Sequence, residues 1–388
     1  MWYFFSPKVI FGEDAIQWLA QIEGQRAFIV TDENMVKLGY VDIVCEQLKV
    51  ASIEVDSFTE IEPEAHRSTV ERCAQAMAAF SPDWVIGLGG GSCLDTSKVA
   101  WLLYERPDVP LEAINPLENY GLRSKARLVA IPTTAGSGSD VSQAAILLDT
   151  EERRKIVIAC YEFMADYSVV DPRFTIDAPV VLTADTGIDV LCHAIDTYQS
   201  TFANDFIDGL CLHAARLVFD YLPSAVSMGK TDPIAREKMA NAATIAGIAV
   251  ANSNIALVHA LGHGAGAVLN LPHGRVTAIF LPLVIEYNTN GGVGRYLEIA
   301  RYVGIEAIDE HHAGWTLAKA IRELMQRVNL PLSLEQTGVT NEAFRNELEA
   351  ICDRVEMDLG LICSRRFPYR EDIQRLLEYA YNGRQVDF

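Results

Sequence analysis

The sequence is poor in basic residues, with 32 lysines and arginines against 52 aspartates and glutamates, and its formal net charge at pH 7 is −20. A surface of this sign repels nucleic acid and anionic membranes, so we expect neither as a partner. The chain has 388 residues, half of them hydrophobic. That length suffices for two domains of ordinary size, each with its own core.

The sequence also lacks the paired cysteines of zinc ribbons and redox motifs, because none of its eight cysteines forms a Cys-x-x-Cys pair. Most of them stand among apolar residues, which favours reduced thiols and a cytoplasmic location. The apolar start, Trp2–Phe5, is too short for a signal-peptide core and has no basic lead.

Charged residues are missing from one long stretch, between Met239 and Pro272. The stretch is long enough to span a membrane. Its histidine, asparagine, serine and glycine content, and the turn at its end, favour buried helices instead.

The first half alternates short β-branched runs with helical periods, which is typical of a mainly parallel sheet with helices on both faces. Beyond residue 172 helical periods dominate, so we expect an α/β domain over residues 1–180 and an all-α domain over residues 181–388. The predicted strands are Trp2–Phe5, Lys8–Phe11, Ala27–Val30, Ser52–Phe58, Trp84–Leu88 and Leu128–Ile131, and the predicted helices cover 15–22, 41–48, 64–80, 94–106 and 371–381.

Five of the eight histidines lie between residues 193 and 273. Two pairs at a spacing of four place their side chains on one face of a helix, and a further histidine follows in a turn. These residues are Asp189 with His193, His259 with His263, and His273. Imidazoles in so apolar a stretch need partners, and a carboxylate with three imidazoles suits a divalent transition metal such as Fe or Zn. The alternative is a set of core histidines that bind nothing.

A glycine-rich turn, Gly87–Ser92, follows a predicted strand and opens a helix. It is neither G-x-G-x-x-G nor a Walker loop. Consecutive glycines still let backbone N–H groups approach a pyrophosphate, and the helix N-terminus adds partial positive charge. The alternative is a tight structural turn. A second polar turn, Thr133–Ser139, could bind the phosphates, ribose or nicotinamide.

Asp32 ends an early strand of the predicted sheet. A carboxylate there can accept hydrogen bonds from the adenosine ribose and would repel a 2′-phosphate, which favours NAD(H) over NADP(H). An equally good interpretation is an N-cap for the helix that follows.

Five motifs now stand in order along the chain: Gly-Gly-Gly-Ser92-x-x-Asp95-x-x-Lys98, Pro132-Thr-Thr-Ala-Gly-Ser-Gly, Asp189-x-x-x-His193-Ala-Ile, His259-x-x-x-His263 and Pro272-His273-Gly274. Together they resemble the iron-dependent (group III) alcohol dehydrogenases over nearly the whole chain.

The resemblance implies a dehydroquinate-synthase-like fold, with an N-terminal Rossmann-like domain, a helical C-terminal domain and the active site in the cleft between them. It implies that Fe(II), or Zn(II) as in some relatives, binds to Asp189, His193, His259 and His273, and that His263 lies beside nicotinamide and substrate. With the turns and Asp32, the predicted NAD(H)-binding residues are Asp32, Gly89, Gly90, Gly91, Ser92, Asp95, Lys98, Thr133, Thr134 and Ser137. A homodimer or larger homo-oligomer, often joined through the N-terminal strand, is also implied.

The chain departs from the family pattern at three places. Asp196 and Asp140 stand where glutamate is usual, and both changes keep the charge. Cys363–Arg366 differs from the usual Asn-Pro-Arg run. We hypothesise that Arg365 and Arg366 bind an anionic tail on the substrate, against the alternative of solvated surface charges.

The predicted function is metal-dependent interconversion of an alcohol and an aldehyde or ketone with NAD(H), with His263 as a proton relay or, alternatively, a packing residue. One rival is a non-redox lyase on the same fold, like dehydroquinate synthase. Others are a relative of the glycerol dehydrogenase or maleylacetate reductase type, and a metal-binding protein without catalysis.

Overall fold

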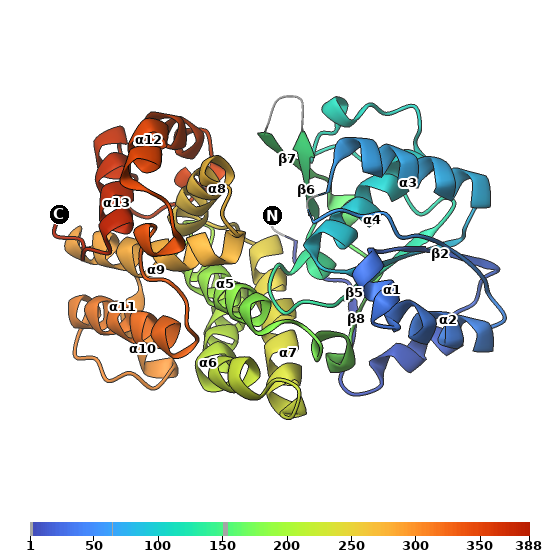
Figure 1. The fold of residues 1–388 in the computed structure, drawn as a ribbon, viewed down its shortest axis with the longest axis horizontal. Helices are drawn as coiled ribbons and strands as arrows, with labels where there is room; N and C mark the ends of the chain where they lie inside the picture. The colour runs from blue at the N-terminus through green and yellow to red at the C-terminus, as the bar shows by residue number, and fades with distance from the viewer. Residues whose placement is uncertain (1–2, 64, 150–153) are drawn as a thin grey trace. The chain divides into compact units, whose positions relative to one another are not determined.

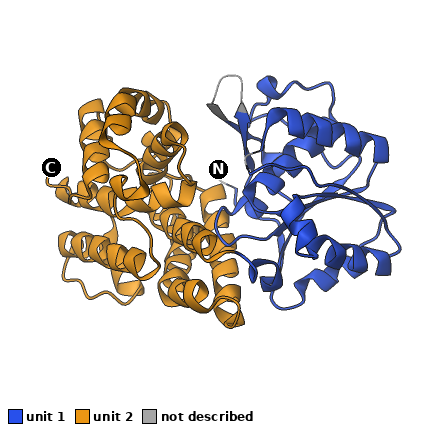
Figure 2. Ribbon diagram, in the orientation of Figure 1, with its two compact units in different colours: residues 1–178 blue, residues 179–388 orange. Residues whose placement is uncertain are grey.

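The computed structural model describes residues 3–63, 65–149 and 154–388. The chain separates into two compact units, residues 1–178 and residues 179–388 (Figure 2). The sequence placed this boundary after residue 180. The first unit mixes strands and helices, and every element of the second is a helix. The predicted fold class is confirmed.

A six-stranded sheet forms the centre of the first unit (Figure 1). All its pairings are parallel, as predicted, and the strand order is β1-β8-β5-β4-β2-β3. The strands are β1 (Lys8–Phe11), β2 (Arg26–Val30), β3 (Glu54–Phe58), β4 (Trp84–Gly89), β5 (Arg127–Pro132) and β8 (Tyr167–Val170).

Alternate side chains of the central strands enter two separate cores, because successive residues of a strand point to opposite faces. In β4, Val85 packs in the core that contains α3 (Arg67–Phe80) and α4 (Gly91–Glu105). Its neighbour Ile86 packs in the other core, with the 3-10 helix η1 (Ala15–Gln21) and α2 (Tyr40–Val50).

The predicted strand at Trp2–Phe5 is wrong for residues 3–5, which form no strand, and Trp2 lies outside the described residues. β1 already takes the edge beside β8, and Pro7 has no N–H for a ladder. The predicted helix at 15–22 is a 3-10 helix, and the one predicted from Glu64, outside the described residues, begins at Arg67. An antiparallel hairpin of β6 (Ala144–Asp149) and β7 (Arg154–Ala159) was not predicted.

In the second unit, α5 lies at the centre and packs against α6, α7, α8 and α9. The uncharged stretch before residue 273 supplies the second half of α7 and all of α8. No helix in the described part of the chain is both long and apolar enough to cross a bilayer. The helices are α5 (Val180–Tyr198), α6 (Asp205–Met228), α7 (Pro233–Ala251), α8 (Leu257–Leu269), α9 (His273–Asn290), α10 (Tyr296–Tyr302), α11 (Glu310–Arg327), α12 (Asn341–Glu356) and α13 (Arg370–Asn382).

The C-terminal end of α4 is fixed by the buried carboxylate of Glu105. Its oxygens accept hydrogen bonds from the N–H groups of Ser124, Lys125 and Ala126 at 2.9–3.0 Å. The indole of Trp101 donates a further bond. Burial raises the pKa of Glu105, but the hydrogen bonds outweigh burial and lower it. The helix that begins at the glycine-rich turn is thereby tied to the start of β5.

We expect Glu105→Gln to lower the free energy of unfolding at pH 7 by about 2 kcal/mol, because buried donors lose a charged acceptor. The folded pKa lies below the ordinary value of 4.5. The carboxylate therefore stabilises the protein above that value, and the difference between the two proteins should shrink as pH falls through the folded pKa. Urea unfolding at pH 7 and pH 4 measures both effects. Glu46→Gln, on the exposed face of α2, is the matched control. Equal stability at pH 7 would contradict the expectation.

Candidate functional site

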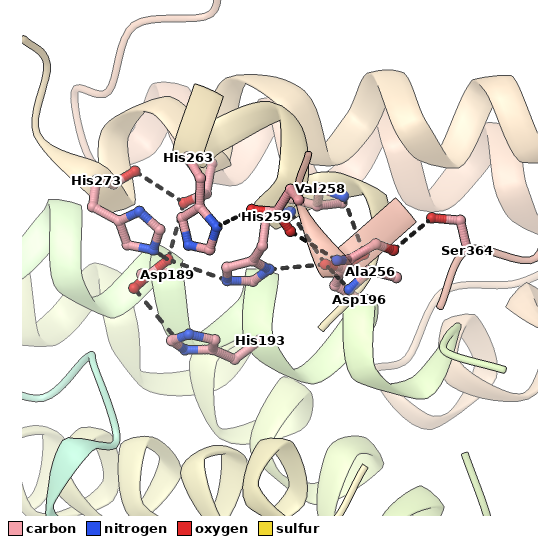
Figure 3. A network of polar contacts seen from close by, with 12 residues as sticks. Asp189, His193, Asp196, Ala256, Val258, His259, His263, His273 and Ser364 are labelled. Atoms are coloured by element: carbon pink, nitrogen blue, oxygen red, sulfur yellow. Dashed lines mark hydrogen bonds and ion pairs between the residues drawn. The ribbon is translucent and has the colours of Figure 1, made fainter. Parts of the chain in front are cut away.

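Three helices of the second unit carry the predicted metal ligands (Figure 3). Asp189 and His193 lie one turn apart on α5, and His259 lies on α8, as their spacing predicted. His273 was expected in a turn, and that detail is wrong. It is the first residue of α9, because the helix starts directly after its cap residue Pro272.

Glycines let these helices approach one another closely enough for the ligands to meet. A Cβ on Gly274 of α9 would lie 2.1 Å from the carbonyl oxygen of Asp185 on α5. A Cβ on Gly262 of α8 would lie 2.5 Å from Cγ2 of Thr277 on α9. Any larger residue would force the helices apart. Arg275 holds the same junction with two hydrogen bonds to the Asp185 carboxylate, at 2.8 and 3.0 Å.

The four predicted ligands converge. One oxygen or nitrogen from each lies within 4.8 Å of all the others. The nearest nitrogens of His193, His259 and His273 lie 4.0, 3.9 and 3.6 Å from the Asp189 carboxylate. These separations are too long for hydrogen bonds and suit ligands that each stand about 2.1 Å from a shared ion.

Two of these nitrogens have no other partner. Nδ1 of His193 and Nε2 of His259 are buried and make no hydrogen bond within the described residues. Each such buried atom costs about 1–3 kcal/mol, so two side by side indicate an absent ligand. One carboxylate oxygen and three imidazole nitrogens suit Fe(II) or Zn(II) better than Mg²⁺ or Ca²⁺. The residues present therefore fit the expected metal.

The ionisation states also suit a metal. Burial raises the pKa of Asp189, but the facing imidazoles and a hydroxyl bond outweigh burial and bring it to about 2. Burial lowers the pKa of His193 to about 4 and that of His273 to about 3. At neutral pH the carboxylate is charged and these two imidazoles are neutral, which are the forms that bind metals.

Asp196 orients His259 by contacting the ring nitrogen farther from Asp189 (Figure 3). Its Oδ2 lies 2.8 Å from Nδ1 of His259 and accepts the N–H of Ala256 at 2.7 Å. With Nδ1 donating, Nε2 keeps its lone pair toward Asp189. Burial lowers the pKa of His259, but the bond to Asp196 outweighs burial and raises it. Thr277 supports the carboxylate ligand similarly, with its hydroxyl donating to Asp189 Oδ1 at 2.9 Å.

His263 lies beside the four ligands and is not one of them. Its ring stacks on that of His273, with centroids 5.2 Å apart. Its Nδ1 lies 2.8 Å from Oδ2 of Asp358, which follows the end of α12.

Asp196, Thr277 and Asp358 have no predicted role from the sequence alone. Helical spacing could have suggested two of them. Asp196 follows Asp189 by seven residues and Thr277 follows His273 by four, so each shares a helix face with a predicted ligand. Asp358 has no such signal, because it is 95 residues from His263 and no local pattern joins them.

The glycine-rich turn lies where β4 passes into α4. Gly89 has a φ of +151°, and a Cβ there would lie 2.6 Å from the sulfur of the cysteine four residues on. α4 begins at Gly91 after its cap Gly90, with no side chain of the described residues capping its first N–H groups. The hydroxyl of Ser92 donates to the carbonyl of Pro63 at 2.5 Å. Free amides and the positive end of the helix suit a phosphate.

The second predicted turn adjoins the first. The N–H of Thr133 donates to the carbonyl of Gly89 at 3.0 Å. Cβ atoms built on the next two glycines would lie 3.5 Å from Thr134 and 3.4 Å from Ser137. The structure therefore brings these predicted cofactor residues together at the carboxyl ends of β4 and β5, where α/β folds bind dinucleotides.

Asp95 and Lys98 connect α4 to the segment after the second turn. Nζ of Lys98 donates to the hydroxyls of Ser139 and Ser142, each at 3.0 Å, and to the carbonyl of Ala144 at 2.9 Å. Burial lowers the pKa of Lys98 to about 8. Asp95 accepts a hydrogen bond from the same Ser139 hydroxyl. Both side chains thus support the two turns, and direct contact with a cofactor stays a prediction.

Asp32 caps α1 (Glu33–Lys37), with Oδ1 accepting the N–H groups of Asn34 and Met35 at 2.7 and 3.2 Å. Of the two interpretations of Asp32 from the sequence, the structure shows the N-cap. Oδ2 lies 3.4 Å from Sγ of Cys93, beside the glycine-rich turn. Its bond to a ribose stays a prediction.

The arginine pair binds the protein's own backbone. Arg366 donates to the carbonyls of Tyr287 and Phe388 and stacks over the Tyr287 ring at 3.7 Å. Arg365 donates to the carbonyl of Ser200 at 3.3 Å. Both side chains are partly buried, unlike the solvated charges of the alternative, and the binding of an anionic substrate tail stays a hypothesis.

Two family models match the chain. The one described as iron-containing alcohol dehydrogenase matches residues 6–172. The one described as the C-terminal part of the Fe-containing alcohol dehydrogenase family matches residues 183–381.

Curated relatives match along nearly the whole chain. Aldehyde-alcohol dehydrogenase 2 of Entamoeba histolytica is 36% identical over 98% of this chain, which covers 46% of that protein. The chain thus spans about half the length of such relatives. NADPH-dependent butanol dehydrogenase of Clostridium saccharobutylicum is 32% identical, with both chains covered completely.

Solved structures agree. An iron-containing alcohol dehydrogenase of Thermococcus thioreducens superimposes with a TM-score of 0.90 at 29% identity, over 99% of this chain and all of that one. Sulfoacetaldehyde reductase of Bifidobacterium kashiwanohense, in complex with NAD+, gives a TM-score of 0.87 at 26% identity, with 98% of each chain covered.

We expect Fe(II) or Zn(II) to raise the unfolding temperature of metal-free protein, because a ligand of the native state stabilises it. Asp196→Asn should weaken metal affinity about 10- to 100-fold, because His259 loses the acceptor that orients it. Competition titration against a chelator measures the affinity. Asp220→Asn, an exposed position on α6, makes the same charge change and should bind as the wild type does. Undiminished affinity of Asp196→Asn would disprove the orienting role.

Proposed function

The chain belongs to the iron-containing alcohol dehydrogenase family, and from this premise we propose that it is a metal-dependent oxidoreductase that interconverts an alcohol with an aldehyde or ketone, using NAD(H). The observation that carries the proposal is the convergence of one carboxylate and three imidazoles in the helical unit. It is supported by a glycine-rich turn suited to a pyrophosphate in the α/β unit.

Fe(II) is the proposed metal, with Zn(II) as the alternative. When bound, the ion would supply a Lewis acid for the substrate oxygen. Asp189 adds a negative charge to the ligand set and so moderates that acidity. Asp196 and Thr277 hold two of the ligands in place. The residues that would hold the ion are Asp189, His193, His259 and His273.

His263 is the proposed proton relay. In the oxidising direction the alcohol loses a hydride to C4 of nicotinamide and a proton from its hydroxyl, and a carbonyl group forms. His263 lies one helical turn from His259 and against the ring of His273, so it stands next to the proposed position of the hydroxyl. Its side chain is 29% exposed, which lets it exchange a proton with solvent.

NAD(H) is the proposed cofactor, in preference to NADP(H). Oδ2 of Asp32 makes no backbone hydrogen bond in the described chain and is the oxygen available to ribose hydroxyls. A carboxylate at this position repels a 2′-phosphate. One similar structure contains NAD+ and one relative is NADPH-dependent. Asp32, two residues after the end of β2, is therefore the residue that we propose selects NAD(H) over NADP(H) in this chain.

We further propose a cytoplasmic homodimer or larger homo-oligomer with a small alcohol or aldehyde as substrate. All eight cysteines are free thiols, which supports a reducing compartment. Among the described strands, β1 lies at the edge of the sheet and pairs on one side with β8 alone, and Phe11 at its end is 67% exposed. The acidic surface argues against nucleic acid and anionic membranes as partners.

An anaerobic NADH-oxidation screen over neutral and acidic aldehydes tests the activity, with Fe(II) or Zn(II) added back to metal-free protein. We expect NADH consumption that matches alcohol formation, depends on metal, and falls at least about 100-fold in Asp189→Asn. A non-redox lyase would bind NAD and metal without net turnover of NADH. Metal-loaded protein that binds NADH but reduces no aldehyde or ketone would overturn the proposal.

Asp32→Ser tests the cofactor choice. Serine keeps an N-cap acceptor for α1 and removes the charge. We expect kcat/KM for NADPH to rise about 10-fold and that for NADH to fall, with the unfolding temperature little changed. Initial rates with both cofactors measure this. Asp56→Ser, in the neighbouring strand β3, is the control for a lost surface charge. Unaltered cofactor preference would remove Asp32 from the ribose site.

A further inference from the structure

We propose that Asp358 is a positioning residue that fixes the ring orientation and the tautomer of His263. The catalytic consequence rests on the proposed function, in which His263 relays the proton. The positioning itself follows from the geometry of the helical unit alone.

Both oxygens of Asp358 are engaged. Oδ2 lies 2.8 Å from Nδ1 of His263, and Oδ1 accepts the N–H of Gly360 at 2.7 Å. The second bond caps a short 3-10 helix, Leu359–Leu361. The cap needs only Oδ1, so the bond from Oδ2 to the imidazole is an additional function of the same side chain. Because the cap immobilises the carboxylate, the imidazole that it meets is immobilised as well.

Small residues bring this carboxylate to the histidine. A Cβ on Gly264 of α8 would lie 2.6 Å from Cγ2 of Val355 on α12, so the glycine allows the two helices to pack closely. A Cβ on Gly360 would lie 2.6 Å from the carbonyl oxygen of Ala256, at the start of α8. The segment after α12 therefore lies in a fixed register on α8, with Asp358 opposite His263.

The arrangement repeats the one behind His259. In both pairs an aspartate Oδ2 lies 2.8 Å from Nδ1 of an imidazole on α8. A neutral imidazole that donates from Nδ1 has its acceptor at Nε2. For His259 that nitrogen faces the other three proposed metal ligands. For His263 it makes no hydrogen bond within the described part of the chain, so Asp358 leaves it as a free acceptor.

Burial raises the pKa of Asp358, but the bond to His263 outweighs burial and lowers it. The residue is therefore a charged acceptor at neutral pH, and it favours the Nδ1–H form over the Nε2–H form. An asparagine would not enforce this choice, because its amide can donate to Nδ1 as well as accept from it.

The experiment compares wild type, Asp358→Asn and Asp358→Glu with Asp353→Asn. Asp353 is an exposed residue of α12 that pairs with Arg370, so its variant controls for the lost charge. In Zn(II)-loaded wild type, ¹⁵N NMR of labelled histidines should show His263 as the Nδ1–H tautomer, identified by its loss in His263→Gln. Asp358→Asn should shift this signal toward the other tautomer. Asp358→Glu should restore it in part.

Kinetics supply the second measurement. We expect kcat of Asp358→Asn to fall about 10- to 100-fold, while KM for NADH and the affinity for Zn(II) change less than about twofold. Partial recovery is expected in Asp358→Glu, and wild-type rates in Asp353→Asn. A purely structural role would lower the unfolding temperature and metal affinity together and leave no selective effect on kcat.

Three results would overturn the proposal: an Nε2–H tautomer in the wild type, an unchanged tautomer in Asp358→Asn, or equal losses of kcat and metal affinity. The wild-type spectrum needs no variant, so it decides even if Asp358→Asn fails to fold. If the wild type turned over no substrate, the proposed function would fail, and the NMR result would still decide whether Asp358 positions His263.

Discussion

The helical unit depends on one constraint: a buried carboxylate, Asp189, stands among three imidazoles at 3.6–4.0 Å, and a buried nitrogen of His193 and one of His259 make no hydrogen bond within the described residues. Unpaired polar groups in a protein interior cost free energy. A divalent cation at their centre would satisfy both nitrogens and balance the charge of the carboxylate. Because such a cation would bind the native arrangement, its binding would add to the stability of this unit.

Ligands from three helices can share an ion only if the helix axes lie close together. Glycine supplies that closeness at Gly262 and Gly274, where a methyl group would already collide with the neighbouring helix. Glycine inside a helix costs up to about 1 kcal/mol relative to alanine. The two glycines stand where the helices must approach each other to bring the four proposed ligands together.

The sequence carried enough information for the parts of the site that are local. The spacing of Asp189 with His193, and of His259 with His263, follows helical geometry, and glycine runs after a strand have few explanations. Long-range features escaped. The bond between Asp358 and His263 depends on how α12 packs on α8, and the hairpin β6–β7 lies in a region without clear alternation. Tyr3–Phe5 shows the opposite error, since these residues have strand propensity and form no strand, which shows that propensity alone does not decide strand formation.

Lys98 illustrates why a motif residue needs a structure before it receives a role. Its place after the glycine-rich turn is compatible with a phosphate ligand. Its ammonium group instead donates three hydrogen bonds, to the hydroxyls of Ser139 and Ser142 and to the carbonyl of Ala144, in the interior of the first unit. A charge buried this way holds α4 against the second turn, so it affects a cofactor by fixing the turns. Sequence pattern alone does not separate contact with a ligand from support of the loop that makes the contact.

Asp196 shows how a single carboxylate can serve backbone and side chain together. It accepts the N–H groups of Ala256, Val258 and His259, which have no acceptor within the first turn of α8, and it also binds the imidazole of His259. A negative charge at this helix end is favourable in its own right. Asp196 thus ties α5 to the start of α8. Asp358 contacts the next turn of the same helix. Asp196 and Asp358 thus contact two successive turns of α8 and restrain its rotation about its axis. The same two contacts orient the imidazoles of His259 and His263.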